Sequence, residues 1–274
     1  MNILVPTDFS EVSESAADYA AEFALALGKT KTRLIFSHVF TMPVPVSDIP
    51  VVTVPLEDME KEAMKLLRAL HKRITTRHGA IETELKTNPG FAVDEISSII
   101  KSHKIDLLIM GVTGAGKAPD MYGSNATSVI SRATCPVIIV PKGHKFKKPS
   151  TVALACDYKS IVPDETVEKF KSFVHLFNSK VLVFNVLKPT ELATYEKAAA
   201  EVNLENALGN VKYSLHFQVS ENLVQEINAF VDEHKVEILA MFPHNYSFFK
   251  GLVHHSATKE MAFSTHIPLL SIHE

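Results

Sequence analysis

The chain contains one series of strands and helices written twice, and this repeat limits the available folds more than any other feature. Five segments of the first half recur in the same order in the second half. The matched pairs are ILVPTD and TVALACD, LIFSHVF and VLVFNVL, IETELKTNPGFAVDEI and VKYSLHFQVSENLVQEI, IDLLIMG and VEILAMF, and TCPVIIV and THIPLLSI. One apolar run could recur by chance, but an ordered series of five indicates two copies of one domain.

Each copy alternates apolar strands with helices. In the first copy, Ser10 is placed to cap a helix, and apolar residues at helical spacing continue to Gly28, where the pattern ends. Further helices are expected over residues 59–74 and 93–103, with a short one over residues 125–133. Because such alternation is typical of a parallel sheet with helices on both faces, we predict an α/β fold.

The repeat predicts two tandem, doubly wound, five-stranded parallel-sheet domains that form a pseudo-dimer, and we take the strand order of each to be 3-2-1-4-5. The domains are placed at residues 1–143 and 149–274. The basic stretch HKFKK, residues 144–148, lies between them and is interpreted as a solvated linker. In such a sheet, ligands bind beyond the carboxyl ends of the strands where the strand order reverses. A ligand site is therefore expected between the first and fourth strands.

Composition limits the partners and the compartment. Hydrophobic residues make up 46% of the 274 residues, the net charge is −3, and the sequence pI is about 6.5. This balance offers no basic field for nucleic acid or an anionic membrane, and no apolar run is long enough to span a bilayer. The start lacks a signal-peptide pattern, and Cys135 and Cys156 do not suggest a disulfide framework, so a cytoplasmic location is expected.

The segment GVTGAGKAPDMYGSN, residues 111–125, is rich in glycine and follows the apolar strand IDLLIM. It fits part of the P-loop pattern, but Ala118 replaces the hydroxyl residue that would hold Mg²⁺ and Pro119 follows at once, so we reject a P-loop. Two interpretations stay open. The segment is either a surface loop or a phosphate cradle, in which glycines let backbone N–H groups approach an anion beside a helix N-terminus.

Together these features resemble the universal stress protein family in its tandem two-domain form. The family motif G-x2-G-x9-G-[ST] follows the fourth strand, as Gly111-x2-Gly114 and Gly123-Ser124 do here, and PTDFS and HVF are also similar to the family's first two strand ends. The resemblance implies a stress-response protein that binds an adenine nucleotide (ATP, ADP or AMP), with Mg²⁺ as a companion. The site residues that it implies are Pro6, Thr7 and Asp8 near the nucleotide and its metal, the Val39 backbone at the adenine edge, Gly111 and Gly114 at the ribose and phosphates, and Gly123, Ser124 and Asn125 at the outer phosphates.

Each copy departs from the family motif in its own way. Eight residues separate Gly114 from Gly123, one fewer than in the family motif. The second copy keeps the family spacing but has Phe242, Asn245 and His255 at the glycine positions. We therefore expect one nucleotide per chain, in the first copy. The resemblance implies that the second copy is a pairing partner, joined through the edges of the last strands PVIIV and IPLLSI, and a homodimer stays open.

No nucleophile–base pattern of a known enzyme class is visible, so a binding protein is favoured and ATP turnover is expected to be absent or slow. The alternatives are a slow ATPase and a pseudo-dimer that contacts a partner without any nucleotide. Four histidines gather in the second copy without a metal-ligand spacing, and we expect them to be ordinary structural or exposed residues. They are His244, His254, His255 and His266.

Overall fold

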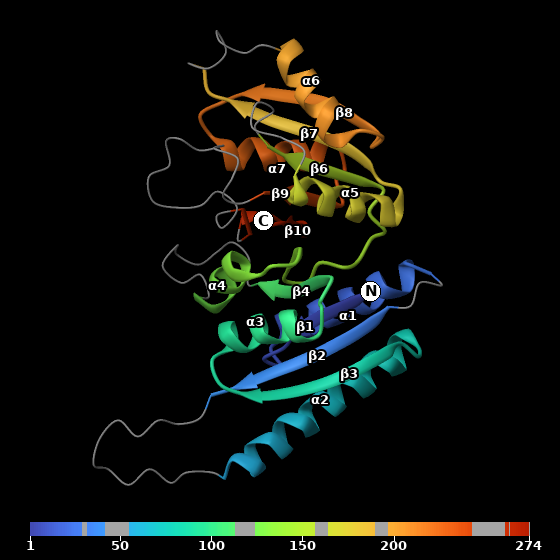
Figure 1. Ribbon diagram of the computed structural model, residues 1–274, viewed down its shortest axis with the longest axis vertical. Helices are drawn as coiled ribbons and strands as arrows, with labels where there is room; N and C mark the ends of the chain where they lie inside the picture. The colour runs from blue at the N-terminus through green and yellow to red at the C-terminus, as the bar shows by residue number, and fades with distance from the viewer. Residues whose placement is uncertain are drawn as a thin grey trace, which may run out of the picture.

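Strands and helices alternate through both halves of the computed structural model (Figure 1). The structure describes residues 1–28, 32–41, 55–112, 124–156, 164–189, 197–242, 261–262 and 264–273, with the backbone alone at residues 124–125 and 197–201. None of the helices in these ranges is both long and apolar enough to cross a membrane.

The strands of the first half form a parallel sheet in the order β3-β2-β1-β4-β5. They are β1 (Asn2–Pro6), β2 (Arg33–Phe40), β3 (Glu82–Pro89), β4 (Leu107–Val112) and β5 (Val137–Pro141). The second half repeats this arrangement in the order β8-β7-β6-β9-β10, again with parallel neighbours. Its strands are β6 (Thr151–Ala155), β7 (Lys180–Leu187), β8 (Tyr213–Val219), β9 (Ile238–Met241) and β10 (Leu269–Ser271). Each half therefore has the predicted order 3-2-1-4-5.

One antiparallel pairing joins the two halves into a single ten-stranded sheet. Ile139 of β5 lies opposite Leu269 of β10, and Val137 lies opposite Ser271. The last strand of each half therefore covers the edge of the other, as the family resemblance implies for the runs PVIIV and IPLLSI. This pairing leaves β3 and β8 as the outer edges of the sheet.

The helices cover the two faces of the sheet in a pattern that follows from the alternation of side chains along each strand. In β1, Ile3 and Val5 pack with α1 (Glu11–Ala26) and α2 (Leu56–His78), whereas Leu4 packs with residues of α3 (Ala92–Ser102) and α4 (Ser124–Arg132). The second half repeats this division between its two faces. Its helices are α5 (Glu165–Phe177) and α6 (Lys197–Leu208) on the first face and α7 (Leu223–Glu233) on the other.

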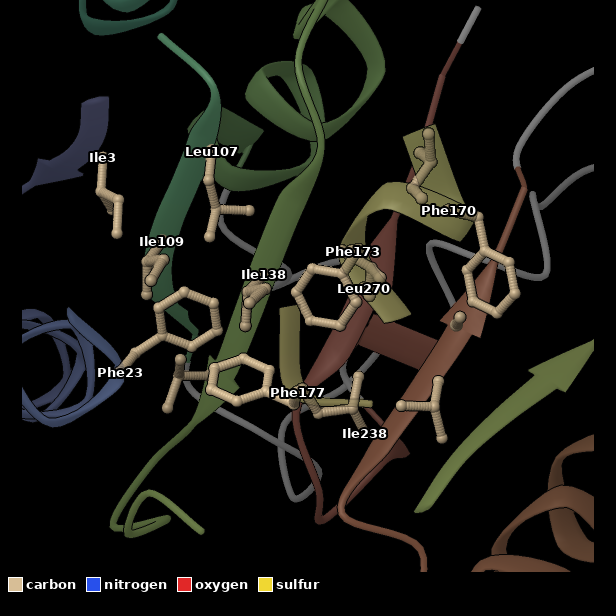
Figure 2. Close-up of a cluster of buried hydrophobic side chains, with 14 of the residues drawn as sticks. Ile3, Phe23, Leu107, Ile109, Ile138, Phe170, Phe173, Phe177, Ile238 and Leu270 are labelled. Atoms are coloured by element: carbon tan, nitrogen blue, oxygen red, sulfur yellow. The ribbon is translucent and has the colours of Figure 1, made fainter. Parts of the chain in front are cut away.

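An aromatic cluster connects the two halves on the face of α1 and α5. Figure 2 shows Phe23 of α1 beside Phe177 of α5, and their ring centroids are 5.2 Å apart in an edge-to-face arrangement. Phe173 stacks on Phe23 at 6.2 Å. Phe146 contacts both Phe23 and Phe177, at 6.0 and 6.5 Å. The cluster therefore supplies a second contact between the halves, besides the β5–β10 pairing.

The position of Phe146 corrects our interpretation of HKFKK as a solvated linker. The three lysines of this stretch are exposed, but Phe146 is half-buried and packs against the core. Its ring also meets Tyr19 edge to face at 5.2 Å. The segment between β5 and β6 therefore takes part in the packing between the halves.

A charged cluster fastens α1 to α2, and it predicts a pH dependence of stability. The carboxylate of Asp18 accepts hydrogen bonds from Arg73 Nη1 at 2.7 Å and pairs with His78 Nε2 at 2.8 Å. Burial raises the pKa of Asp18, but the hydrogen bonds and the positive charge of Arg73 outweigh it, so the pKa falls below its usual 3.8. The stabilisation is thus present above pH 3.8 and is lost as the pH falls through the pKa of the folded protein.

We expect Asp18→Asn to lower the free energy of unfolding by about 1–2 kcal/mol at pH 7, because it removes the charge from a partly buried, hydrogen-bonded pair. Urea unfolding of both proteins at pH 7 and at pH 3 measures this. The difference between them should shrink at pH 3, because this pH lies below the usual pKa of 3.8 that Asp18 has in the unfolded chain. An equal difference at both pH values would show that the ionisation of Asp18 contributes nothing.

Candidate functional site

A cavity of about 690 Å³ opens at the carboxyl ends of β1 and β4, where the strand order of the first half reverses. The ends of β1, β2 and β4 form its floor, and the beginnings of α1 and α3 and part of α4 form its walls. Of the residues proposed from the sequence, Pro6, Thr7, Asp8, Val39 and Gly111 all line this cavity. The structure therefore brings together residues that are far apart in the chain.

The turn after β1 is held by the side chain of Thr7. Its hydroxyl lies 3.0 Å from the hydroxyl of Ser13 and accepts a hydrogen bond from the backbone N–H of Phe9 at 3.0 Å. The backbone N–H of Thr7 donates to the carbonyl of Ser37, which extends the β1–β2 pairing by one residue. Thr7 is buried, and these contacts give it a structural role at the cavity floor.

Asp8 places an ionised carboxylate at the rim of the cavity. Its Oδ1 accepts hydrogen bonds from the backbone N–H of Ser10 at 3.0 Å and from the Ser10 hydroxyl at 2.6 Å. Burial raises the pKa of Asp8, but hydrogen bonds from Ser10 and Ser13 lower it more, so the pKa lies below the usual 3.8. The charge is therefore present at neutral pH. The Ser10 hydroxyl also accepts a hydrogen bond from the Ser13 N–H, which confirms the predicted cap of α1.

The turn that carries Asp8 has an unusual backbone conformation. Phe9 has φ of +61°, which bulky residues rarely adopt. Its ring packs on that of His38, with the centroids 4.5 Å apart. His38 Nδ1 lies 2.8 Å from the carbonyl oxygen of Thr7. These contacts with the end of β2 hold the turn in place.

The floor of the cavity is largely apolar and contains, besides the hydroxyl of Thr7, the buried hydroxyl of Ser37. Pro6, Val39 and Met110 line it from the ends of three neighbouring strands. Ser37 precedes Val39 by two residues and therefore shares its face of β2. The Ser37 side chain is 1% exposed, and its hydroxyl has no hydrogen-bond partner among the described residues.

Gly111 lines the cavity, but the structure gives a packing reason for the glycine. A Cβ on Gly111 would lie 2.5 Å from the carbonyl oxygen of Val12 and 2.7 Å from Val12 Cγ1. The glycine is thus required because the beginning of α1 packs directly on β4. Its role at the ribose and phosphates, which the resemblance implies, is not tested by this contact.

The remaining residues of the glycine-rich segment are only partly covered. Gly114 and Gly123 lie outside the described residues. Ser124 and Asn125 form the first two positions of α4, with the backbone alone described. Ala126, at the third position of α4, lines the cavity. The amino-terminal turn of α4 therefore lies beside the cavity.

Phe242 of the second half corrects an expectation from the sequence. The sequence places the bulky Phe242 where the backbone would approach a ligand, but its side chain is buried in the core and meets the ring of Phe170 edge to face at 5.7 Å. Phe170 belongs to α5, the counterpart of α1. The second half thus places a large side chain between helix and strand where the first half has Gly111. Asn245 and His255 lie outside the described residues.

Several polar and aromatic residues along the cavity were not proposed from the sequence, among them Phe91, Asp94, Ser37 and Ser13. Phe91 and Asp94 come from the beginning of α3, Ser37 comes from β2, and Ser13 comes from α1. Ser37 could have been found from the sequence, because a polar residue inside an apolar strand shares a face with Val39. For Phe91, the available signal was an aromatic residue directly before a helix.

The histidines give no sign of a metal centre in the part of the chain that the structure covers, where no group of three or more potential His, Cys, Asp or Glu ligands is found. His266 Nε2 instead lies 2.7 Å from Asp232 Oδ1. The other three histidines of the second-half group, His244, His254 and His255, lie outside the described residues.

Comparisons with known proteins agree with this architecture. The sequence model of the Universal stress protein family matches residues 1–141. A universal stress protein of Methanocaldococcus jannaschii is 31% identical over 152 residues, which span 52% of this chain and 83% of that protein.

Two solved structures share the fold over nearly the whole chain. A universal stress protein from Archaeoglobus fulgidus has a TM-score of 0.75 at 20% identity, covering 99% of this chain and 98% of that one. A Pseudomonas aeruginosa protein of unknown function has a TM-score of 0.60 at 11% identity, covering 99% and 92%. At these identities the two structures show the fold alone. The family match and the archaeal relative show more: the chain belongs to the universal stress protein family.

Proposed function

We propose that this protein binds one adenine nucleotide in the cavity of its first half and acts as a nucleotide-responsive regulatory module. The position of the cavity carries the proposal, because doubly wound sheets bind their ligands beyond the carboxyl ends of the strands where the order reverses. A volume of about 690 Å³ is also suitable for a small ligand or cofactor. The strand order of the first half and the family membership support the same site.

The chemistry of the cavity favours a ligand with one apolar and one anionic end. Pro6, Val39 and Met110 offer an apolar surface suited to a planar base. The amino-terminal turn of α4 offers backbone N–H groups and the positive end of a helix dipole, which suit phosphate. We therefore place the base over the ends of β1, β2 and β4, and the phosphates toward α4.

A divalent cation is part of the proposal. Asp8 lines the cavity, and its carboxylate repels a triphosphate unless a cation accompanies it, whereas the carboxylate of Asp94 is paired with Arg132 Nη1 at 2.8 Å. Mg²⁺ is commonly held by one or two carboxylates together with phosphate oxygens, so the Asp8 carboxylate at the rim fits this ion. Bound Mg²⁺ would neutralise charge on the phosphates, and Asp8 would orient it.

The nucleotide content of the purified protein gives the first test. Heating should release an adenine nucleotide, identified by mass, at one per chain. If the released material contains none, and titration calorimetry with ATP, ADP and AMP shows no binding at millimolar concentration, the proposal is wrong. The protein would then be an interaction module without a nucleotide.

Asp8→Asn tests the role of the carboxylate. Asparagine keeps the oxygen that accepts the hydrogen bonds of Ser10 and removes the charge, so the turn should persist. We expect about tenfold weaker binding of ATP in the presence of Mg²⁺, the loss typical of one charged contact. AMP should be affected less, because it carries fewer phosphate oxygens for the cation.

Asp157→Asn is the matched control, because Asp157 follows TVALAC as Asp8 follows ILVPT in the repeat. It should leave ATP affinity unchanged. The reverse result, with Asp157→Asn weakening binding and Asp8→Asn neutral, would place the nucleotide in the second half. Release of inorganic phosphate should be absent or slow in all three proteins. Rapid turnover abolished by Asp8→Asn would establish an ATPase instead.

A further inference from the structure

Phe91 is exposed at the wall of the cavity. Among the large hydrophobic residues that the structure describes, it is the most exposed, at 70%. It lines the same cavity as Val39 and Asp8. A planar ligand in a cavity of this size would pack on the exposed aromatic ring and cover part of it.

The position of Phe91 also opposes local helix stability. It is the N-cap residue of α3, where Ser, Thr, Asp and Asn are preferred because their side chains accept a hydrogen bond from the helix. Phe91 makes no such side-chain bond. The residue thus leaves a helix end uncapped and an aromatic ring in solvent. Both features are explained if the ring serves a ligand.

Hydrogen bonds fix the turn before α3, so the backbone that carries the Phe91 ring is well ordered. The backbone N–H of Gly90 donates to the carbonyl of Phe40 at the end of β2, at 3.0 Å. Asn88 Nδ2 donates to Glu95 Oε2 at 3.0 Å, which ties the end of β3 to the first turn of α3. Gly90 has φ of +143°, a conformation that other residues rarely adopt. The backbone of Phe91 therefore needs little reorganisation to receive a ligand.

We propose that Phe91 is a stacking surface for the planar base of the nucleotide and contributes to the preference of the site for nucleotides over inorganic phosphates. The inference rests on the proposed function and adds a specificity residue to it. The ring lies at the cavity wall formed by α3, while the phosphate-binding features, α4 and Asp8, belong to other elements. Base recognition and phosphate recognition thus come from different parts of the wall.

Calorimetry on Phe91→Ala tests this separation. Loss of base–aromatic stacking should weaken ATP and adenosine binding by about 5- to 150-fold. Binding of inorganic tripolyphosphate, which has no base, should change by less than about twofold, because the phosphate-binding groups stay in place. Phe217→Ala is the matched control, since Phe217 is also an exposed phenylalanine but lies on β8 of the second half. It should leave all three affinities unchanged.

A tryptophan at this position gives a direct optical readout. The chain contains no tryptophan, so Phe91→Trp introduces a single one. ATP should change its fluorescence as the base covers the indole, whereas tripolyphosphate should not. Binding of ATP detected by calorimetry without any change in fluorescence would overturn the proposal.

Phe91→Ser separates a ligand role from a structural one. Serine restores a preferred N-cap residue, so the melting temperature of the free protein should rise while ATP affinity falls. A fall in both would show that Phe91 supports the fold. Unchanged ATP affinity in Phe91→Ala would overturn the stacking role and leave the nucleotide site intact, whereas a wild type that binds no adenine nucleotide would overturn both.

Discussion

Gly111→Ala is expected to lower the free energy of unfolding by about 1–3 kcal/mol, the range for overpacking a filled core. The added Cβ would lie 2.5 Å from the carbonyl oxygen of Val12, an atom of the backbone that cannot rotate away. β4 cannot retreat, because it is hydrogen-bonded between β1 and β5. α1 would have to move instead, although its own residues Ala16 and Ala20 are fully buried. Urea unfolding followed by far-UV circular dichroism measures the loss.

Gly143→Ala is the matched control for this prediction. A Cβ on Gly143 meets nothing within 4 Å, but its φ of +74° disfavours other residues. Gly143→Ala should lower the free energy of unfolding by about 1 kcal/mol, because alanine disfavours this backbone conformation. If Gly111→Ala is as stable as the wild type, α1 can shift outward without loss, and the close packing of α1 on β4 contributes nothing. The comparison separates a steric requirement for glycine from a conformational one.

The Gly111 result also bears on how motif glycines are interpreted. The resemblance assigns Gly111 to the ligand, whereas the structure shows that the position of an added Cβ is already filled by Val12 of α1. A variant at Gly111 that loses nucleotide binding would therefore not demonstrate a ligand contact. Asp8→Asn and Phe91→Ala are more informative, because both side chains are exposed and neither substitution adds atoms to the core.

The repeat and the alternation of strands and helices were sufficient to predict the fold. Both depend on local periodicity, which burial of apolar faces imposes on each element separately. The Ser10 cap is local in the same way. The β5–β10 pairing was expected from the family resemblance, and the apolar last strands are suited to it.

Features that depend on contacts distant in sequence could not be predicted in this manner. The need for glycine at position 111 arises from Val12, almost a hundred residues earlier. The burial of Phe242, which follows β9, depends on packing against Phe170 of α5. Phe146 lies in a stretch whose lysines suggested solvent, and its burial depends on Tyr19 and Phe23. The periodicity of apolar residues does not indicate which residues of distant elements contact each other.

Phe23→Ala is expected to cost about 3–5 kcal/mol of unfolding free energy, the usual range for removing a buried phenylalanine. Phe23 is fully buried in the cluster between α1 and α5. Because its partners Phe173 and Phe177 belong to the other half, the loss should reach both halves. Urea unfolding, monitored by circular dichroism and by hydrogen exchange in each half, measures this.

A double-mutant cycle tests whether the cluster couples the halves. Phe23→Ala and Phe177→Ala should be non-additive by about 0.5–1.5 kcal/mol, because each removes the ring that the other contacts. Phe230→Ala is the control, since Phe230 stacks on Phe184 within the second half, on the opposite face of the sheet. Its effect should add to that of Phe23→Ala within about 0.5 kcal/mol.

The outcome decides how a ligand in the first half could affect the second. If Phe23 and Phe177 are coupled, stabilisation of α1 by a nucleotide beside Asp8 reaches α5 through the aromatic cluster as well as through the sheet. If the two substitutions are additive, the halves are held together mainly by the three residue pairs between β5 and β10. A nucleotide in the first half would then act on a partner through its own domain.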